Sequence, residues 1–370
     1  MTRRNGLVLT GGGARGAYQV GVLRALAEAL PRGCANPFPV VTGTSAGAIN
    51  AAALACFSDD FHNAVSALER VWGGFRIDHV IRSDPWTMAR SSLAWFVALI
   101  TGGVVCSPPR SLLDNAPLRE LIEREIPMER IGPAIAARYL HAVSVNASAY
   151  SLARSISFYD GDASIDDWSR TRREGRRATL TADHLMASVA LPLVFPAARV
   201  EHEYYGDGAL RQGAPLSPAL HLGAERLLVI ALRNERPNEA PTADAPADYP
   251  SMGQIAGYML DALFTDSLYN DAERLRRINL TAAVAPGASL KPIDLMIISP
   301  SEDPREIAAR HVKSLPRSVR TLLWGVGALN RGGMQLVSYL LFESGYTTEL
   351  LELGYRDAKK QLPDVLNFLS

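Results

Sequence analysis

A serine stands between two glycines in the stretch Gly43-Thr44-Ser45-Ala46-Gly47. An apolar run at 38–41 precedes it, and an alanine-rich segment that predicts a helix over 48–55 follows it. A strand that turns sharply into a helix through Gly-x-Ser-x-Gly presents the serine hydroxyl at a helix N-terminus, where free N–H groups favour an alkoxide. Glycines at 43 and 47 let neighbouring backbone come close. The stretch therefore predicts Ser45 as a nucleophile.

A second glycine-rich turn, Gly11-Gly12-Gly13-Ala14-Arg15-Gly16, follows a predicted strand over 6–10. Three glycines leave consecutive N–H groups pointing into one concavity, which suits an oxyanion hole. The same turn matches the dinucleotide fingerprint, which expects an acidic residue at the end of the next strand. Here that strand ends at Ser45, and Glu28 falls inside a predicted helix. Nucleotide or dinucleotide binding by Gly11–Gly16 is the second interpretation.

A serine nucleophile needs a base. None of the seven histidines stands in a context that singles it out; they are His62, His79, His141, His184, His202, His221 and His311. Asp207 is the better candidate, because glycines flank it in Tyr204-Tyr205-Gly206-Asp207-Gly208-Ala209, after a predicted strand. The alternative for Asp207 is an ordinary Asp-Gly turn.

Taken together and in this order, the glycine-rich turn, Gly43-Thr44-Ser45-Ala46-Gly47 and Asp207-Gly208-Ala209 resemble the patatin-like phospholipase family. The segment at 187–196 also resembles the family's approach to its Asp-Gly motif. The resemblance covers roughly residues 6–232, and all three motifs match without a substitution.

The resemblance implies a Ser–Asp dyad without a histidine, in which Ser45 is the nucleophile and Asp207 the base. It implies that the backbone amides of Gly11, Gly12 and Gly13 form the oxyanion hole, with Arg15 fixing the loop or adding positive potential. Gly16, Gly43, Gly47 and Gly208 would support the motifs. The substrates it implies are phospholipids, lysophospholipids or related acyl lipids, cleaved through an acyl-enzyme. A catalytically silent interaction protein on the same scaffold is a further alternative.

The composition excludes several other classes. The formal net charge is 0 and no basic stripe with interleaved aromatics occurs, which argues against nucleic acid as a partner. Cys34, Cys56 and Cys106 are scattered, which argues against a disulfide framework or structural zinc and fits a reducing compartment. No carboxylates or histidines show ligand spacing, so neither metal nor cofactor is expected. With no apolar leader before residue 6 and no apolar run of membrane-spanning length, we expect a cytoplasmic protein, peripheral at a membrane when it meets lipid.

Strand and helix patterns alternate along the first part of the chain. This alternation predicts an α/β fold with a mostly parallel central sheet and helices on both faces. We expect strands over 6–10, 38–41, 139–145, 155–159, 226–232 and 292–298, and helices over 17–30, 48–55, 60–75, 116–138 and 252–278, with 305–360 mainly helical.

The chain is expected to comprise a catalytic domain over 1–232, a Pro-rich surface loop or linker over 233–250, and a mainly helical C-terminal region over 251–370 packed on the catalytic domain. Segments at 339–346 and 353–358 resemble C-terminal regions of bacterial family members and are assigned no catalytic role.

Two segments bear on transient membrane contact. The apolar segment 93–105 is interpreted either as a buried helix or as a lid beside a lipid-binding cleft. A second set of residues is interpreted as a solvated face or an anionic headgroup contact: Arg170, Arg172, Arg173, Arg176 and Arg177.

Overall fold

The computed structural model describes residues 3–84, 86, 100, 111–234, 249–284 and 291–370. Most of the apolar segment 93–105, Cys106 and most of the Pro-rich stretch 233–250 lie outside the described residues. No helix in the described ranges is long and apolar enough to cross a membrane.

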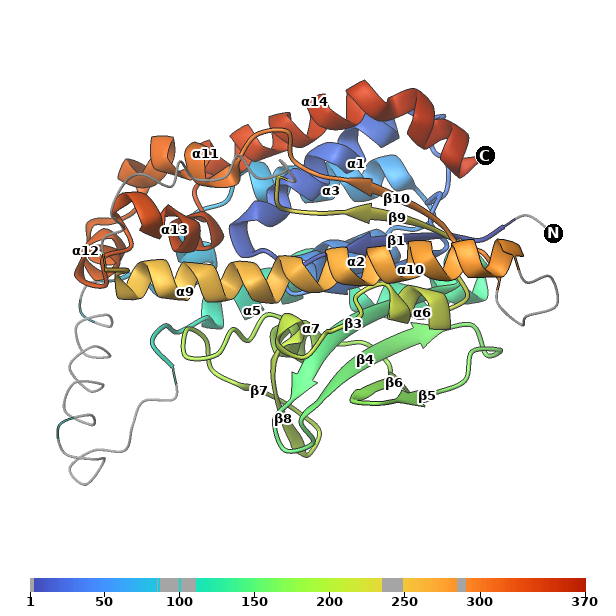
Figure 1. Ribbon diagram of the computed structural model, residues 1–370, viewed down its shortest axis with the longest axis horizontal. Helices are drawn as coiled ribbons and strands as arrows, with labels where there is room; N and C mark the ends of the chain where they lie inside the picture. The colour runs from blue at the N-terminus through green and yellow to red at the C-terminus, as the bar shows by residue number, and fades with distance from the viewer. Residues whose placement is uncertain (1–2, 85, 87–99, 101–110, 235–248, 285–290) are drawn as a thin grey trace.

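A mixed sheet of ten strands forms the centre of the described structure (Figure 1). Five neighbouring strands are parallel, in the order β10-β9-β1-β2-β3. Their bounds are β10 Asp294–Ile298, β9 Arg226–Ile230, β1 Asn5–Leu9, β2 Val40–Thr44 and β3 Ala142–Ala149. Because parallel strands bring their carboxyl ends to one edge, the loops after β1 and β2 meet there. Both glycine-containing motifs follow these two strands.

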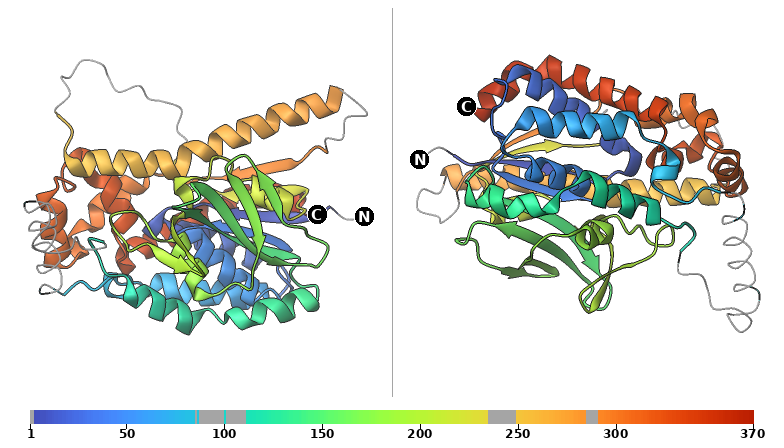
Figure 2. Two further views of the ribbon diagram at one scale, coloured as in Figure 1. Left: turned by 90° about the horizontal axis from the view of Figure 1, so that it is seen from below. Right: turned by 180° about the vertical axis from the view of Figure 1, so that it is seen from behind.

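Beyond β3 the sheet becomes mixed, because antiparallel strands join the parallel ones. A tight turn at 150–153 reverses the chain, so β4 pairs antiparallel with β3, and β8 also pairs antiparallel with β3. Figure 2 shows these strands in green at one end of the sheet. The bounds here are β4 Arg154–Gly161, β5 Trp168–Arg170, β6 Arg173–Arg177, β7 Ala198–Val200 and β8 Glu203–Asp207.

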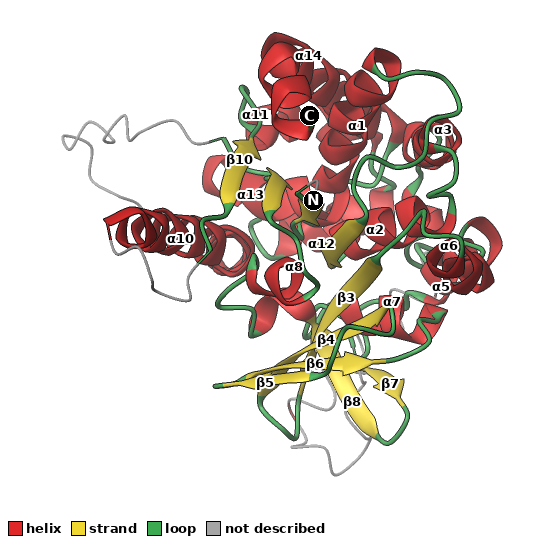
Figure 3. Cartoon of the chain, turned by 90° about the vertical axis from the view of Figure 1, so that its right-hand side faces the viewer, coloured by secondary structure: helices red, strands yellow, loops and turns green. Residues whose placement is uncertain are grey.

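Helices cover both faces of the parallel strands, as the α/β pattern predicted (Figure 3). One face carries α1 (Ala17–Ala29), α2 (Ala46–Cys56), α3 (Phe61–Gly73) and the long α14 (Ser344–Leu369), with α14 packed along α1. The other face carries α8 (Ser217–His221) and α10 (Ser267–Val284).

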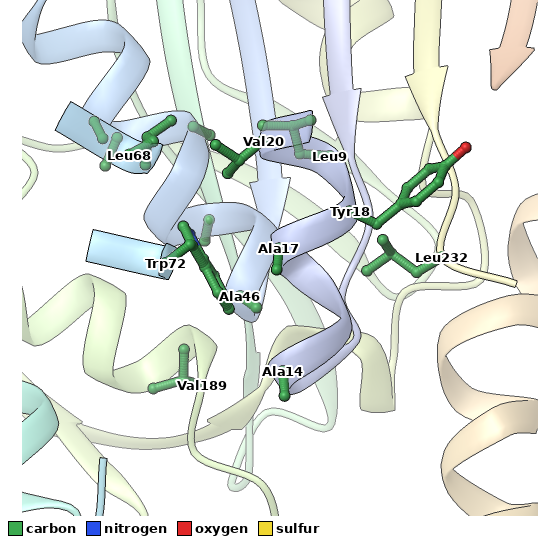
Figure 4. Packing of buried hydrophobic residues seen from close by; sticks show 14 of the residues in the cluster. Leu9, Ala14, Ala17, Tyr18, Val20, Ala46, Leu68, Trp72, Val189 and Leu232 are labelled. Atoms are coloured by element: carbon green, nitrogen blue, oxygen red, sulfur yellow. The ribbon is translucent and has the colours of Figure 1, made fainter. Parts of the chain in front are cut away.

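The alternation of side chains along β1 separates two apolar cores. Leu7 and Leu9 point into the core under α1, α2 and α14, whereas Val8 points into the core under α8 and α10. This is the period-two geometry of a strand buried on both sides. In the larger core, Ala14, Ala17 and Ala46 are small enough to let their helices approach closely (Figure 4).

Two predicted helices are interrupted. The helix expected over 116–138 ends at Glu125 before Pro127, and the chain continues through a short 3₁₀ turn into α6. The helix expected over 252–278 contains a π-helical turn at Ala262–Asp266, between α9 and α10, and extends to Val284. The remaining helix bounds are α5 Ala116–Glu125, α6 Ile131–Ala136, α7 Ala182–Ser188, α9 Met252–Asp261, α11 Pro304–His311, α12 Arg317–Gly325 and α13 Met334–Leu340.

Candidate active site

Ser45 occupies a strained turn between β2 and α2. Its φ of 54° and ψ of −128° lie outside the regions that most residues adopt. A Cβ on Gly43 would lie 2.2 Å from the Gly47 carbonyl oxygen, and one on Gly47 would lie 2.3 Å from the Leu9 carbonyl oxygen. Only glycine fits at either position without a clash with neighbouring backbone. The predicted turn from strand to helix is present, with Ser45 between β2 and α2.

A buried serine holds the backbone of this turn. The N–H of Ser45 donates to Ser188 Oγ at 2.9 Å, and that hydroxyl donates to the Asn146 carbonyl oxygen at 2.6 Å. The Asn146 side chain in turn donates to the Gly43 carbonyl oxygen at 2.9 Å. Ser188 comes from α7 and Asn146 from β3, so residues distant in sequence fix the orientation of Ser45.

Asp207 ends β8 and is buried in the same site, with 1% of its surface exposed. Its Oδ1 accepts a hydrogen bond from the Ala209 N–H at 2.9 Å. The Ser45 hydroxyl interacts with the same carboxyl. Oδ2 nevertheless has no partner at ideal hydrogen-bond geometry among the described residues, so the contact with Ser45 is loose.

Burial dominates the electrostatics of Asp207. Loss of solvent raises the pKa of its carboxyl to about 7, and the contacts with Ser45 and with the Ala209 N–H lower it only in part. A carboxylate with a pKa near neutrality is a far stronger base than an ordinary aspartate.

The first glycine-rich turn lies against Ser45. A Cβ on Gly11 would come within 3.1 Å of the Ser45 Cβ. Gly13 has a φ of 54°, and a Cβ there would meet the Tyr339 carbonyl oxygen at 2.2 Å. Within the described residues, the N–H groups of Gly11 and Gly12 have no hydrogen-bond acceptor. They are therefore free to receive an oxyanion beside the serine.

Side chains close over the same turn. A Cβ on Gly11 would also meet the Phe264 ring at 2.5 Å, and one on Gly12 would meet Leu232 at 2.5 Å. Phe264 comes from the π-helical turn that interrupts α9 and α10. A side chain at either position would therefore clash, which is a steric reason for glycine at both.

Arg15 is buried, and its side chain contacts the C-terminal region of the chain. Its Nε and Nη2 donate to Ser338 Oγ at 3.0 and 2.6 Å, and Nη1 donates to the Tyr339 hydroxyl at 3.2 Å. The guanidinium also lies 3.9 Å from the centroid of the Tyr339 ring and 3.5 Å from a carboxylate oxygen of Asp261. These contacts tie the glycine-rich turn to α13 and α9. They favour the loop-fixing role over a direct charge contribution.

Ser45 and Asp207 line an apolar pocket. It contains about 1010 Å³ of empty space, counting the part that opens to solvent. One side is a stripe along α2, formed by Ala46, Ile49, Ala53 and Phe57, and α3 and α5 supply the facing walls. Besides Asp207, the charged residue in its lining is Glu125, so the pocket suits a hydrocarbon chain.

None of the seven histidines lines this pocket, and all of them lie in described ranges. Sequence reasoning missed Ser188, Asn146 and the pocket walls. Asn146 carried a weak signal, because an asparagine in the middle of a buried strand requires hydrogen-bond partners. Ser188 carried none beyond its place in the 187–196 segment.

One protein-family model matches more than half of this chain. The family model described as "Patatin-like phospholipase" matches residues 7–220. "Patatin-like phospholipase domain-containing protein 7" from Rattus norvegicus and its counterpart from Mus musculus are each 55% identical over 87 residues. That stretch covers 24% of this chain and 5% of each relative. Among solved structures, VipD from Legionella pneumophila aligns with 98% of this chain and 67% of its own, at 14% identity and a TM-score of 0.38.

Proposed function

This chain belongs to the patatin-like phospholipase family, and from that premise we propose that it hydrolyses acyl ester bonds of lipids through Ser45 and Asp207. The observation that carries the proposal is the burial of Asp207 beside Ser45 at the end of an apolar pocket. The site thus combines a nucleophile, a base of raised pKa and room for an acyl chain.

The proposed reaction begins with attack of Ser45 Oγ on the acyl carbonyl carbon, while the Asp207 carboxylate takes the hydroxyl proton. The oxyanion of the tetrahedral intermediate lies against the N–H groups of the glycine-rich turn, Gly11, Gly12 and Gly13. The proton passes to the leaving alcohol as the ester bond breaks, which leaves an acyl-enzyme. Asp207 then takes a proton from water, the hydroxide cleaves the acyl-enzyme, and fatty acid leaves as Ser45 regains its proton.

An ordinary carboxylate is a weak base for a serine hydroxyl, and the raised pKa of Asp207 makes this carboxylate a stronger one. Partial matching of the two pKa values lowers the cost of proton transfer. The position of Ser45 at the N-terminus of α2 stabilises the developing negative charge on oxygen. The network from Ser188 to Asn146 holds that position without taking part in bond making.

The pocket favours a lipid with one long acyl chain in the site. The α2 stripe from Ser45 to Phe57 is roughly 18 Å long at the rise of an α-helix. With about 1.25 Å of extended chain per carbon–carbon bond, it matches an acyl chain of about fourteen carbons. Phospholipids and lysophospholipids both carry such chains, and these are the substrate classes proposed.

Transient membrane contact forms part of the proposal. One side of α9 exposes apolar residues at helical spacing, namely Met252, Ile255, Tyr258 and Met259. Such a stripe on a surface helix partitions into the boundary between headgroups and acyl chains.

The test is covalent labelling with a fluorophosphonate probe, followed by intact-mass measurement. The parent protein should gain one adduct, Ser45→Ala none, and Asp207→Asn an adduct at a greatly reduced rate. Asp160→Asn is the matched control, because burial also raises the pKa of Asp160 but this residue does not line the pocket. Full labelling of Ser45→Ala would refute the nucleophile, and unchanged labelling of Asp207→Asn would refute the base.

A further inference from the structure

Five arginines line a second hollow, separate from the acyl pocket. They are Arg170, Arg172, Arg173, Arg211 and Arg274. The hollow contains about 1330 Å³ of empty space, counting the part open to solvent, and lies between the β5–β6 ribbon, the loop that follows Asp207, and α10. It shares no lining residue with the acyl pocket among the described residues.

These arginines have few counter-charges. Within the described ranges, none of the five forms an ion pair within 4.0 Å. Asp271 is an acidic residue that interacts electrostatically with two of these arginines, Arg173 and Arg274. Its carboxylate also accepts a hydrogen bond from the Leu216 N–H at 3.0 Å. One partly buried carboxyl cannot neutralise five guanidinium groups. The hollow therefore carries a concentrated positive charge in a chain whose net charge is 0.

The β5–β6 ribbon shows that this charge is specific to one face. Arg170 and Arg173 are direct partners in the antiparallel ladder, and like charges directly opposite each other destabilise a sheet. On the other face of the same ribbon, Glu174 binds both Arg154 and Arg176. The arginines on that face share a carboxylate, whereas the arginines of the hollow form no ion pair among the described residues.

A neighbouring histidine responds to the same positive charge. Burial, together with the smaller effect of the charges on Arg170 and Arg173, lowers the pKa of His221 to about 4. At neutral pH His221 therefore adds no charge to the hollow.

We propose that the hollow binds a phosphate group that carries two or more negative charges, such as a phosphate monoester or a diphosphate. Several guanidinium groups around one hollow match such an anion, because the planar guanidinium group of each arginine can donate two N–H bonds to phosphate oxygens. A single carboxylate would neutralise only one of the five charges. Binding removes the repulsion between Arg170 and Arg173 that the free protein retains.

The hollow lies next to the candidate active site without belonging to it. Its wall includes Gln212, whose Oε1 accepts a hydrogen bond from Thr44 Oγ1 at 2.6 Å. Thr44 precedes Ser45, and Ala209, another wall residue, donates its N–H to Asp207. The site does not depend on the chemistry proposed for Ser45, so its test uses binding rather than turnover.

The experiment uses the full chain with Ser45→Ala, so that no lipid is hydrolysed. Inorganic pyrophosphate is titrated by calorimetry, and vesicles of phosphatidylcholine containing either phosphatidic acid or phosphatidylserine are tested by co-sedimentation. Pyrophosphate binding without a preference for phosphatidic acid identifies a free phosphate or diphosphate compound as the source. A preference for phosphatidic acid over phosphatidylserine identifies a lipid headgroup. Both outcomes support the site.

The deciding variant is Arg170→Gln with Arg173→Gln, and the matched control is Arg154→Gln with Arg176→Gln, which removes the same charge from the other face. We expect the first pair to weaken binding about tenfold to a hundredfold and the control pair to change it little. Arg173→Lys keeps the charge but loses the fork, and should fall between them. Equal weakening by both pairs, or no binding of either probe by the parent, would overturn the proposal. Thermal unfolding of each variant establishes that it is folded.

Discussion

Asp207 is buried directly beside Ser45, and the hydroxyl of Ser45 is the side-chain group that interacts with its carboxyl. Removal from solvent holds the pKa of this carboxyl about three units above its ordinary value, at about 7. Burial of Asp207 favours catalysis, because it makes the carboxylate a stronger base. The same burial destabilises the folded protein when the carboxylate is charged, because the charge is removed from water.

The rate of Ser45 acylation should rise with pH through a midpoint near 7. The base acts only when deprotonated, so below the midpoint the rate should fall about tenfold for each pH unit. The measurement is kcat/KM for a short soluble ester as a function of pH, which reports the free enzyme. Asp160→Asn should leave the profile unchanged. A midpoint near 4 would contradict the proposed role of Asp207.

Asp207→Asn should stabilise the protein at alkaline pH. The folded state holds the Asp207 proton up to about pH 7, whereas the unfolded chain loses it near pH 3.8. The folded state therefore binds more protons in this interval, and its stability falls as pH rises from about 4 to 7. Above pH 7 the cost is on the order of 4 kcal/mol, which the neutral amide avoids.

Denaturant unfolding at about pH 8 and about pH 4 tests this expectation. The difference in unfolding free energy between Asp207→Asn and the parent should be large at the higher pH and should shrink at the lower one. A difference that does not depend on pH would show that packing, and not the charge, separates the two proteins.

Arg15→Lys should lower kcat about tenfold with little change in KM. Lysine keeps the charge but cannot bind Ser338 and Tyr339 through a planar fork, so the glycine-rich turn loses its tether. Steady-state kinetics with a soluble ester gives both constants. Arg24→Lys is the control, since Arg24 stacks on Tyr355 at the surface of α1. If both variants retain the parent kcat, the tether does not matter for turnover.

Ala53→Leu should shorten the acyl chain that the enzyme accepts. Ala53 lines the pocket eight residues beyond Ser45, roughly 12 Å along α2. Esters with acyl chains longer than about ten carbons should react about tenfold more slowly, while short esters keep their rate. A series of esters of increasing length provides the measurement, and Ala134→Leu on α6 is the control. Uniform loss across the series would point to misfolding and not to a shorter pocket.

Met252→Ser combined with Tyr258→Ser should reduce hydrolysis of vesicle lipids. Both side chains are more than two-thirds exposed, at 71% and 72%, on the apolar stripe of α9. The variant should bind vesicles several-fold more weakly while hydrolysing a soluble ester at the parent rate. Leu280→Ser on α10, also 70% exposed, is the matched control. Unchanged vesicle binding would show that another surface meets the membrane.

The fold was predictable where the sequence is locally consistent. The strand before the glycine-rich turn and helix α1 follow from an apolar run, small residues and helical spacing, and the structure confirms both. The antiparallel strands were harder to place, because pairing of β8 with β3 depends on contacts between residues about 60 positions apart. Pro127 ended a helix that periodicity alone extended.

The candidate site was predictable only in its motifs. Ser45, Asp207 and the glycines are marked by spacing and steric need, whereas Ser188 reaches the Ser45 backbone only after folding. The pocket likewise forms from three helices whose apolar stripes look like ordinary core in the sequence. Whether an apolar stripe borders the pocket depends on how the helices pack against one another, and no single segment of the sequence determines that packing.

The family match ends at residue 220, yet the structure does not divide there. β9 and β10, which extend the parallel sheet, lie beyond it, and the tether of Arg15 depends on Ser338 and Tyr339 near the other end of the chain. The residues that the family model matches are therefore in contact with strands and helices that follow them in the chain. We therefore expect a change at Ser338 or Tyr339 to require a compensating change at Arg15, because the support of the glycine-rich turn comes from the C-terminal helices.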